Sequence, residues 1–185
     1  GKHQNAAVRA GGNNSQDIFY SIDGADEKQS YFVGLNYYST DSISAMSNDS
    51  EIDPYENNSL TANYTYQISE NNVFENYLTL KESYVKYDEP TAGRDDTKNS
   101  SDNFEAHYNF KFKNTHNNFK NTFGLSKSGT SRMVTKYDGK ENTYEGFKNM
   151  LTYLGEYNFN LDPKIVYGSD IEFFKAKYPT DPGVY

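Results

Sequence analysis

Apolar and polar residues alternate with a period of two along several stretches of the chain, which is the pattern of β-strands with two different faces. Nowhere along the chain is a helical spacing of apolar residues stronger than this alternation. The clearest apolar series are Leu60, Ala62, Tyr64, Tyr66 and Ile68, and Phe104, Ala106, Tyr108, Phe110 and Phe112. Two further series are Tyr31, Val33, Leu35 and Tyr37, and Phe147, Leu151, Tyr153, Tyr157 and Phe159. The interleaved residues predict a polar face: Thr61, Asn63, Thr65, Gln67, Glu105, His107, Asn109 and Lys111.

The connections between these runs predict how the strands follow one another. Short, turn-rich links at 24–29, 69–72, 115–118 and 160–163 indicate four hairpins. Longer polar stretches at 40–59, 88–101 and 130–142 separate the hairpins. We expect nine strands, near residues 5–12, 16–24, 30–39, 59–68, 73–87, 102–114, 118–130, 143–159 and 164–178. The sequence therefore predicts an all-β, antiparallel up-and-down meander with its longer loops at one end.

This arrangement favours a transmembrane β-barrel. Outer-membrane barrels combine long loops at one end with short turns at the other, and each strand presents alternate residues to lipid. Bacterial single-chain barrels have an even number of strands, so nine strands indicate part of a larger barrel. We therefore expect a partial transmembrane β-barrel, with residues 1–185 as the N-terminal part of the barrel domain. A soluble antiparallel sheet with one polar face remains the alternative.

Composition narrows the function classes. The chain has 18 Tyr and 12 Phe, so it is rich in residues that disordered chains lack. It has no Cys, which excludes disulfides, thiolate metal sites and cysteine nucleophiles. A net charge of −8 without a basic stripe disfavours nucleic-acid binding.

The chain shows no motif for catalysis. Its three histidines are predicted in an N-terminal tail (His3), on a polar strand face (His107) and in a tight turn (His116). Neither a helical metal-binding pair nor a nucleophile elbow nor a phosphate-binding loop is present in the sequence. We therefore predict that the protein is not an enzyme and has no catalytic or cofactor-binding residues.

One acidic loop is a candidate calcium site. Hard oxygen ligands are the kind that calcium prefers, and one long predicted loop gathers several of them. The candidate ligands are Asp41, Asp49, Glu51, Asp53 and Glu56, with Asn48 beside them. Their spacing is not that of an EF-hand, and an acidic, solvated loop is the alternative interpretation.

Several stretches resemble one family of membrane receptors. Residues 6–12 are rich in Ala and Gly, residues 17–28 contain a turn with Gly and charged residues, and residues 30–46 end in a strand with Tyr37, Thr40, Asp41, Ser44 and Ala45. These stretches, with 55–66 and 166–170, resemble barrel strands of TonB-dependent outer-membrane receptors of the vitamin B12 and siderophore group. Ser42 stands where that family usually has Gly.

The resemblance implies a specific role. The whole protein would be a 22-stranded barrel in the cell outer membrane, plugged by an N-terminal domain that lies outside these 185 residues. It would import a scarce nutrient, such as a siderophore-iron complex or cobalamin, with energy delivered through TonB. Its partners would be outer-membrane lipid, the plug, TonB and the small-molecule nutrient. In the vitamin B12 branch the loop corresponding to 40–59 holds calcium, so the resemblance implies calcium here.

Two other functions remain open from the sequence. A complete eight-stranded outer-membrane barrel would serve as a pore, an adhesin or an anchor, and it requires that one expected strand be absent, most simply 5–12. A secreted, soluble β-sheet protein would bind sugar or calcium.

Overall fold

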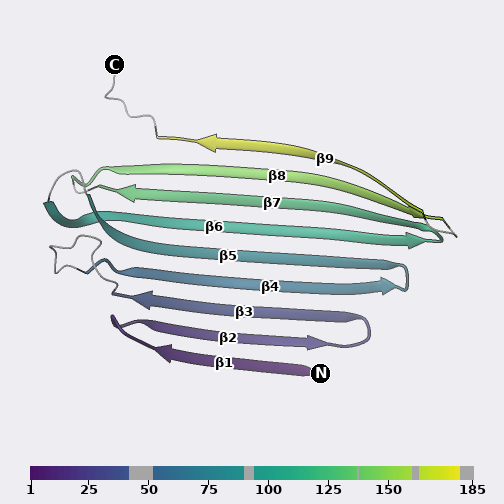
Figure 1. The fold of residues 1–185 in the computed structure, drawn as a ribbon, viewed down its shortest axis with the longest axis horizontal. Coiled ribbons are helices and arrows are strands. Elements are labelled where there is room, and N and C mark those ends of the chain that lie inside the picture. Colours follow the sequence, from purple (N-terminus) through teal and green to yellow (C-terminus); the bar gives the residue numbers. More distant parts are fainter. Residues whose placement is uncertain (42–51, 90–93, 137, 160–162, 180–185) are drawn as a thin grey trace, which may run out of the picture.

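The computed structural model describes residues 1–41, 52–89, 94–136, 138–159 and 163–179 of the chain. All of its regular structure is β-strand (Figure 1). The strands are β1 (Lys2–Ala10), β2 (Gln16–Ala25), β3 (Gln29–Thr40), β4 (Tyr55–Ser69), β5 (Asn72–Glu89), β6 (Arg94–His116), β7 (Phe119–Thr135), β8 (Glu141–Asn158) and β9 (Lys164–Lys177).

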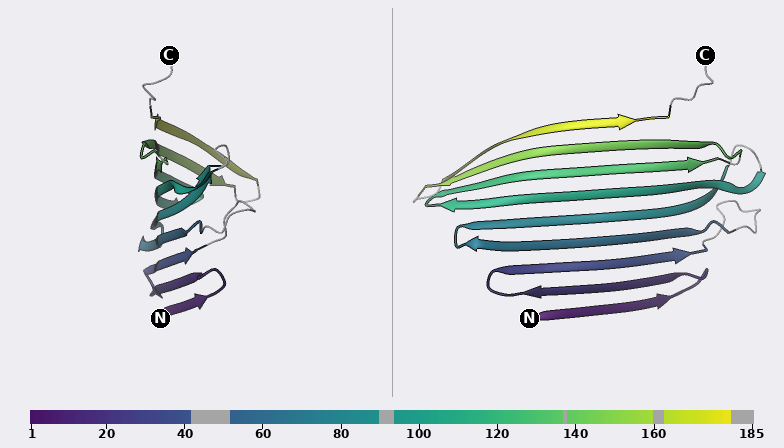
Figure 2. Two further views of the ribbon diagram at one scale, coloured as in Figure 1. Left: turned by 90° about the vertical axis from the view of Figure 1, so that its left-hand side faces the viewer. Right: turned by 180° about the vertical axis from the view of Figure 1, so that it is seen from behind.

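The strands form one antiparallel sheet in the order of the sequence, from β1 to β9. Each strand contacts only its neighbours in the chain, so the sheet is not closed and β1 and β9 are its two edges. Figure 2 shows a single twisted layer from the side and from behind. The predicted all-β antiparallel meander of nine strands is confirmed.

The connections lie at two ends of the sheet. We call the end with residues 26–28, 70–71, 117–118 and 159–163 the tight-turn end, and the end with residues 11–15, 41–54, 90–93 and 136–140 the loop end. Asn117, at the β6–β7 turn, has φ of 51°, a left-handed conformation that Asn tolerates better than most residues.

Two expected loops are much shorter than predicted. Strand β6 begins at Arg94 and β7 continues to Thr135, so the links there are residues 90–93 and 136–140 rather than 88–101 and 130–142. Residues 100–103, for example, pair with 132–135 of β7. A strand ladder is made by backbone groups and does not require apolar side chains, so a polar composition concealed these strand ends. The predicted sorting of loop lengths therefore holds only for 41–54.

The sheet has no hydrophobic core among the described residues, because none of their apolar side chains is buried. Large apolar residues instead remain partly exposed, such as Tyr64 (39%) and Phe147 (48%). The described strands form no second layer. A two-layer sandwich with a shared dry interior is therefore not what these strands build.

Within the described ranges, the structure has no helix that is long and apolar enough to cross a membrane.

Candidate functional site: the two faces of the sheet

One face of the sheet is dominated by apolar and aromatic side chains, and we call it the apolar face. Paired residues of antiparallel strands point to the same side, so the register assigns every strand. We call a series of residues that are paired from each strand to the next a cross-strand line. One such line joins Tyr20, Leu35, Leu60, Leu80, Ala106, Gly129 and Phe147. All four alternating series predicted from the sequence contribute their apolar members to this face.

The opposite face, which we call the polar face, carries the residues predicted for it. One cross-strand line joins Ser21, Gly34, Thr61, Thr79, His107, Ser128 and Lys148. By the same register Asn63, Thr65, Gln67, Glu105, Asn109 and Lys111 lie on this side. The prediction that these residues share one face is confirmed.

Charged side chains on the polar face pair with one another. The Lys113 ammonium lies 2.6 Å from Glu75, and the Lys148 ammonium lies 2.7 Å from Glu172. The polar face thus satisfies much of its charge within the sheet while it remains open to water.

An aromatic row crosses the apolar face near the tight-turn end. Tyr66, Phe74, Phe112, Phe123 and Tyr153 occupy one line of paired positions on five successive strands. Ring centroids of Phe74 and Phe112 lie 5.2 Å apart, and those of Phe123 and Tyr153 lie 5.0 Å apart. Such contacts stabilise aromatic pairs beyond the area that they cover.

The next line toward the turns is made of amides. Asn72, Asn114 and Asn121 are paired neighbours on β5, β6 and β7. The Asn114 amide donates to Asn72 at 2.8 Å, and the Tyr153 hydroxyl donates to Asn121 at 2.9 Å. The aromatic row therefore has an apolar side and a hydrogen-bonding side.

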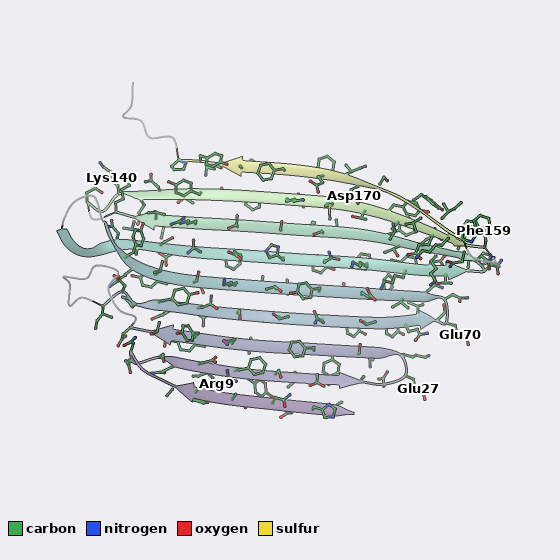
Figure 3. All side chains as sticks on the ribbon, viewed as in Figure 1. Arg9, Glu27, Glu70, Lys140, Phe159 and Asp170 are labelled. Carbon is green, nitrogen blue, oxygen red and sulfur yellow. The ribbon has the colours of Figure 1, made fainter. Side chains whose placement is uncertain are left out.

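The tight-turn end is staggered. Ser30 and Ala25 form the last pair of the β2–β3 hairpin, and the cross-strand line through Ser30 meets β8 at Thr152. Strand β8 continues to Asn158, six residues farther. Glu27, Glu70 and Phe159, labelled at three of these turns in Figure 3, step outward from hairpin to hairpin.

The margin of the apolar face at the loop end shifts in the same direction. Toward the loop end, the polar residues that follow the last apolar residue of this face are Ser39 on β3, Asn58 on β4 and Glu82 on β5, and on β5 Asn76 interrupts the row nearer the tight turns. On β7 and β8 the paired residues Lys127 and Asn149 interrupt the apolar row earlier, and Phe147 follows Asn149 on β8. The line through this pair meets β3 six residues from Ser39, toward the tight turns.

The two margins are therefore parallel to each other, and both are oblique to the cross-strand lines. A shift of six residues over five or six strands, at about 3.3 Å per residue and about 4.8 Å per strand, corresponds to strands inclined by about 35–40° to the normal of the band. Strand β6 departs from the pattern, because its apolar residues continue to Phe104.

The structure describes three of the five predicted calcium ligands, Asp41, Asp53 and Glu56. Asp41 follows β3, and its backbone N–H donates to the Asn13 carbonyl at 3.0 Å. Asp53 is largely buried just before β4, and Glu56 lies on β4 opposite Ser39. Asp49 and Glu51 lie outside the described residues, and within those ranges no group of three His, Cys, Asp or Glu could hold a metal ion. Calcium binding stays a prediction.

The histidines occupy three separate places. His3 belongs to β1, not to a tail as the sequence suggested, and its Nδ1 lies 3.1 Å from Asp23. His107 lies on the polar face between Thr79 and Ser128. His116 is the last residue of β6, next to the turn.

The β2–β3 turn is organised by one carboxylate. The Gln29 side chain donates to Asp26 at 2.9 Å, and the backbone N–H groups of Lys28 and Gln29 donate to it at 2.9 and 3.0 Å. These hydrogen bonds, that of the Gln29 side chain foremost, lower the pKa of Asp26 below its ordinary value.

Sequence reasoning missed an aromatic patch on the polar face. Phe19 and Phe32 lie on this face, and a Cβ at Gly34 would meet the Phe32 ring at 2.9 Å and the Phe19 ring at 3.7 Å. Ser21, directly opposite Gly34, is only 2% exposed. The sequence did contain a signal for this patch, because apolar residues occur at both odd and even positions along β2 and β3.

No protein-family model matches the chain, and no curated protein matches it. The function is therefore inferred from the two faces of the sheet.

Proposed function

We propose that this sheet is part of the wall of a TonB-dependent receptor in a bacterial outer membrane, which imports a scarce nutrient such as a siderophore-iron complex or cobalamin. The apolar face contacts lipid, and the polar face looks into the lumen toward the plug. Residues such as Thr61, Asn63 and Lys111 bind water or hydrogen-bond to the plug.

The observation that carries the proposal is the oblique apolar band. Strands of transmembrane barrels are tilted by about 35–45°. Their apolar band must therefore cross the strands obliquely, and a soluble sheet has no such requirement. The inclination of about 35–40° obtained from both margins agrees with that tilt.

The height of the band supports the same assignment. On β6, which departs from the oblique margin and carries the apolar row farther toward the loop end, the apolar side chains extend from Phe104 to Phe112. At about 3.3 Å per residue and this inclination they span about 20 Å, close to the apolar band of about 25 Å in outer-membrane barrels.

The alternatives have less support. A complete eight-stranded barrel required one of the nine expected strands to be absent, whereas nine strands are present in the described part of the chain and β1 pairs with β2 over its whole length. A soluble protein would leave residues such as Phe147 and Phe173 in water, at 48% and 60% exposure.

Single-cysteine labelling tests the membrane assignment cleanly, because the chain has no native Cys. A fluorophore at Leu78→Cys, on the apolar face, should be quenched by brominated lipid in reconstituted vesicles. The matched Thr79→Cys label, one residue away on the polar face, should be quenched by aqueous iodide. Equal access of both quenchers to both labels would contradict the proposal.

Uptake tests the transport role. Cells that depend on the protein should lose uptake of the ferric siderophore or of cobalamin when either the protein or TonB is removed. Uptake of both nutrients that persists without the protein would contradict this part of the proposal.

A further inference from the structure

Two lysines stand on the apolar face without an acidic partner. Lys127 of β7 and Lys175 of β9 are exposed, and neither forms an ion pair with any described residue. Their neighbour Lys177 differs, because its ammonium lies 3.6 Å from Glu145. On the polar face Lys113 and Lys148 are paired, whereas Lys81, Lys111 and Lys120 form no ion pair with a described residue, so the position of Lys127 and Lys175 on the apolar face is what distinguishes them.

These lysines lie at a definite level of the band. Lys127 and Asn149 mark the loop-end margin on β7 and β8, and Lys175 lies two residues beyond Phe173, which continues that line on β9. A lysine at the middle of a lipid-facing band is costly, whereas one at the margin can extend its aliphatic stem along apolar surface and place its ammonium among lipid headgroups.

The charge of this margin changes across the sheet. On β4, β5 and β6 it carries Asn58, Glu82 and Asp102, whereas β7 and β9 carry Lys127 and Lys175, with Asn149 on β8 between them and Glu145 farther out paired with Lys177. Lys127 and Lys175 are two strands apart and offset by two residues along the strands, a separation of about 12 Å, with Phe147 and Asn149 of β8 between them. Two four-carbon stems can span this distance, so both ammonium groups can reach one phosphate.

We propose that Lys127 and Lys175 form a binding site for the phosphate group of an anionic membrane lipid, with the lipid chains extending toward the tight-turn end along Phe173 and Ile171. The inference rests on the proposed function, because it needs the apolar face to contact lipid. Each lysine near a charged bilayer surface contributes several-fold to binding, so the pair contributes about tenfold or more.

The test compares the reconstituted protein in vesicles of phosphatidylcholine alone and in vesicles with about one fifth phosphatidylglycerol. Native mass spectrometry of the detergent-extracted protein then counts retained phosphatidylglycerol. We expect the K127Q/K175Q variant to retain about tenfold less of this lipid than the original protein. The K127R/K175R variant should restore retention, and K81Q/K120Q, which removes two lysines from the polar face, should not change it.

The outcomes separate this site from the proposed function. Equal phosphatidylglycerol retention by K127Q/K175Q and the original protein, with both inserted in vesicles, overturns the lipid site alone. Failure of every form to insert overturns the proposed function. Loss of retained lipid on adding millimolar inorganic phosphate would identify a site for free phosphate and overturn the assignment to lipid.

Discussion

The two faces of the sheet are similarly accessible but chemically opposite. On the apolar face Tyr64 is 39% exposed, and on the polar face Tyr77 is 44% exposed. Their neighbours differ, because Tyr64 lies among Leu60, Ala62 and Tyr66 along its strand, whereas Tyr77 lies among Glu75 and Thr79. Accessibility alone therefore does not distinguish the faces, whereas register and the pattern of charge do.

The comparison also shows what each face requires from its surroundings. The polar face pairs charges such as Glu75 with Lys113 and needs only water beyond them. The apolar face has aromatic contacts but no covering layer among the described residues, so it needs a medium that does not penalise apolar surface. Lipid on one face and water on the other satisfies both.

The largest expected difference between the faces comes from a charge at the middle of the band. Tyr64→Lys should lower the free energy of unfolding by about 2–4 kcal/mol, and Thr65→Lys, one residue farther on the polar face, by less than about 1 kcal/mol. Urea titration in lipid vesicles measures both. Because the Tyr64 hydroxyl donates to Gln29 at 3.1 Å, Tyr64→Phe is the reference that isolates the charge. Equal losses at 64 and 65 would mean that the apolar face does not contact lipid.

A second, smaller difference tests the obliquity of the band. Leu35 and Phe147 lie on the same cross-strand line, but the oblique band places Leu35 well inside and Phe147 at the loop-end margin. Measured against Ala at each site, Leu35→Lys should cost about 2–4 kcal/mol and Phe147→Lys about 0–1 kcal/mol. The readout is again urea titration in vesicles. A band perpendicular to the strands predicts equal costs, and that result would remove the main support for the barrel assignment.

The positions of the strands, and the faces to which the residues of β4 and β6 point, could be predicted from the sequence because both follow from local alternation. The series Leu60–Tyr66 and Phe104–Phe112 keep their period without interruption, so their faces were correct. On β5 and β7 the alternation fails, since Asn76 and Lys127 stand on the apolar face. Only pairing with β4, β6 and β8 assigns those strands.

The stagger and the lysine site could not be predicted from the sequence at all. Both depend on which residues face one another across hairpins, and pairing between strands is not encoded in the period of a single strand. The residues that mark the loop-end margin, such as Ser39 and Asn149, are more than a hundred positions apart in the chain. The calcium prediction relied instead on residues close in sequence, and it stays a prediction because Asp49 and Glu51 lie outside the described residues.

The smallest expected effect lies at the tight-turn end, outside both faces. Hydrogen bonds to ionised Asp26 lower its pKa below the ordinary value of 3.8, so the ionised carboxylate stabilises the β2–β3 turn. A lowered pKa in the folded state means that this stabilisation is complete above the ordinary pKa and is lost as the pH falls through the lowered pKa. Amide chemical shifts of Lys28 and Gln29 should therefore titrate with a midpoint below 3.8, and Asp26→Ala should abolish that titration. Glu27→Gln is the matched control, which should leave the midpoint unchanged, and a midpoint at or above 3.8 would show that the carboxylate does not organise the turn.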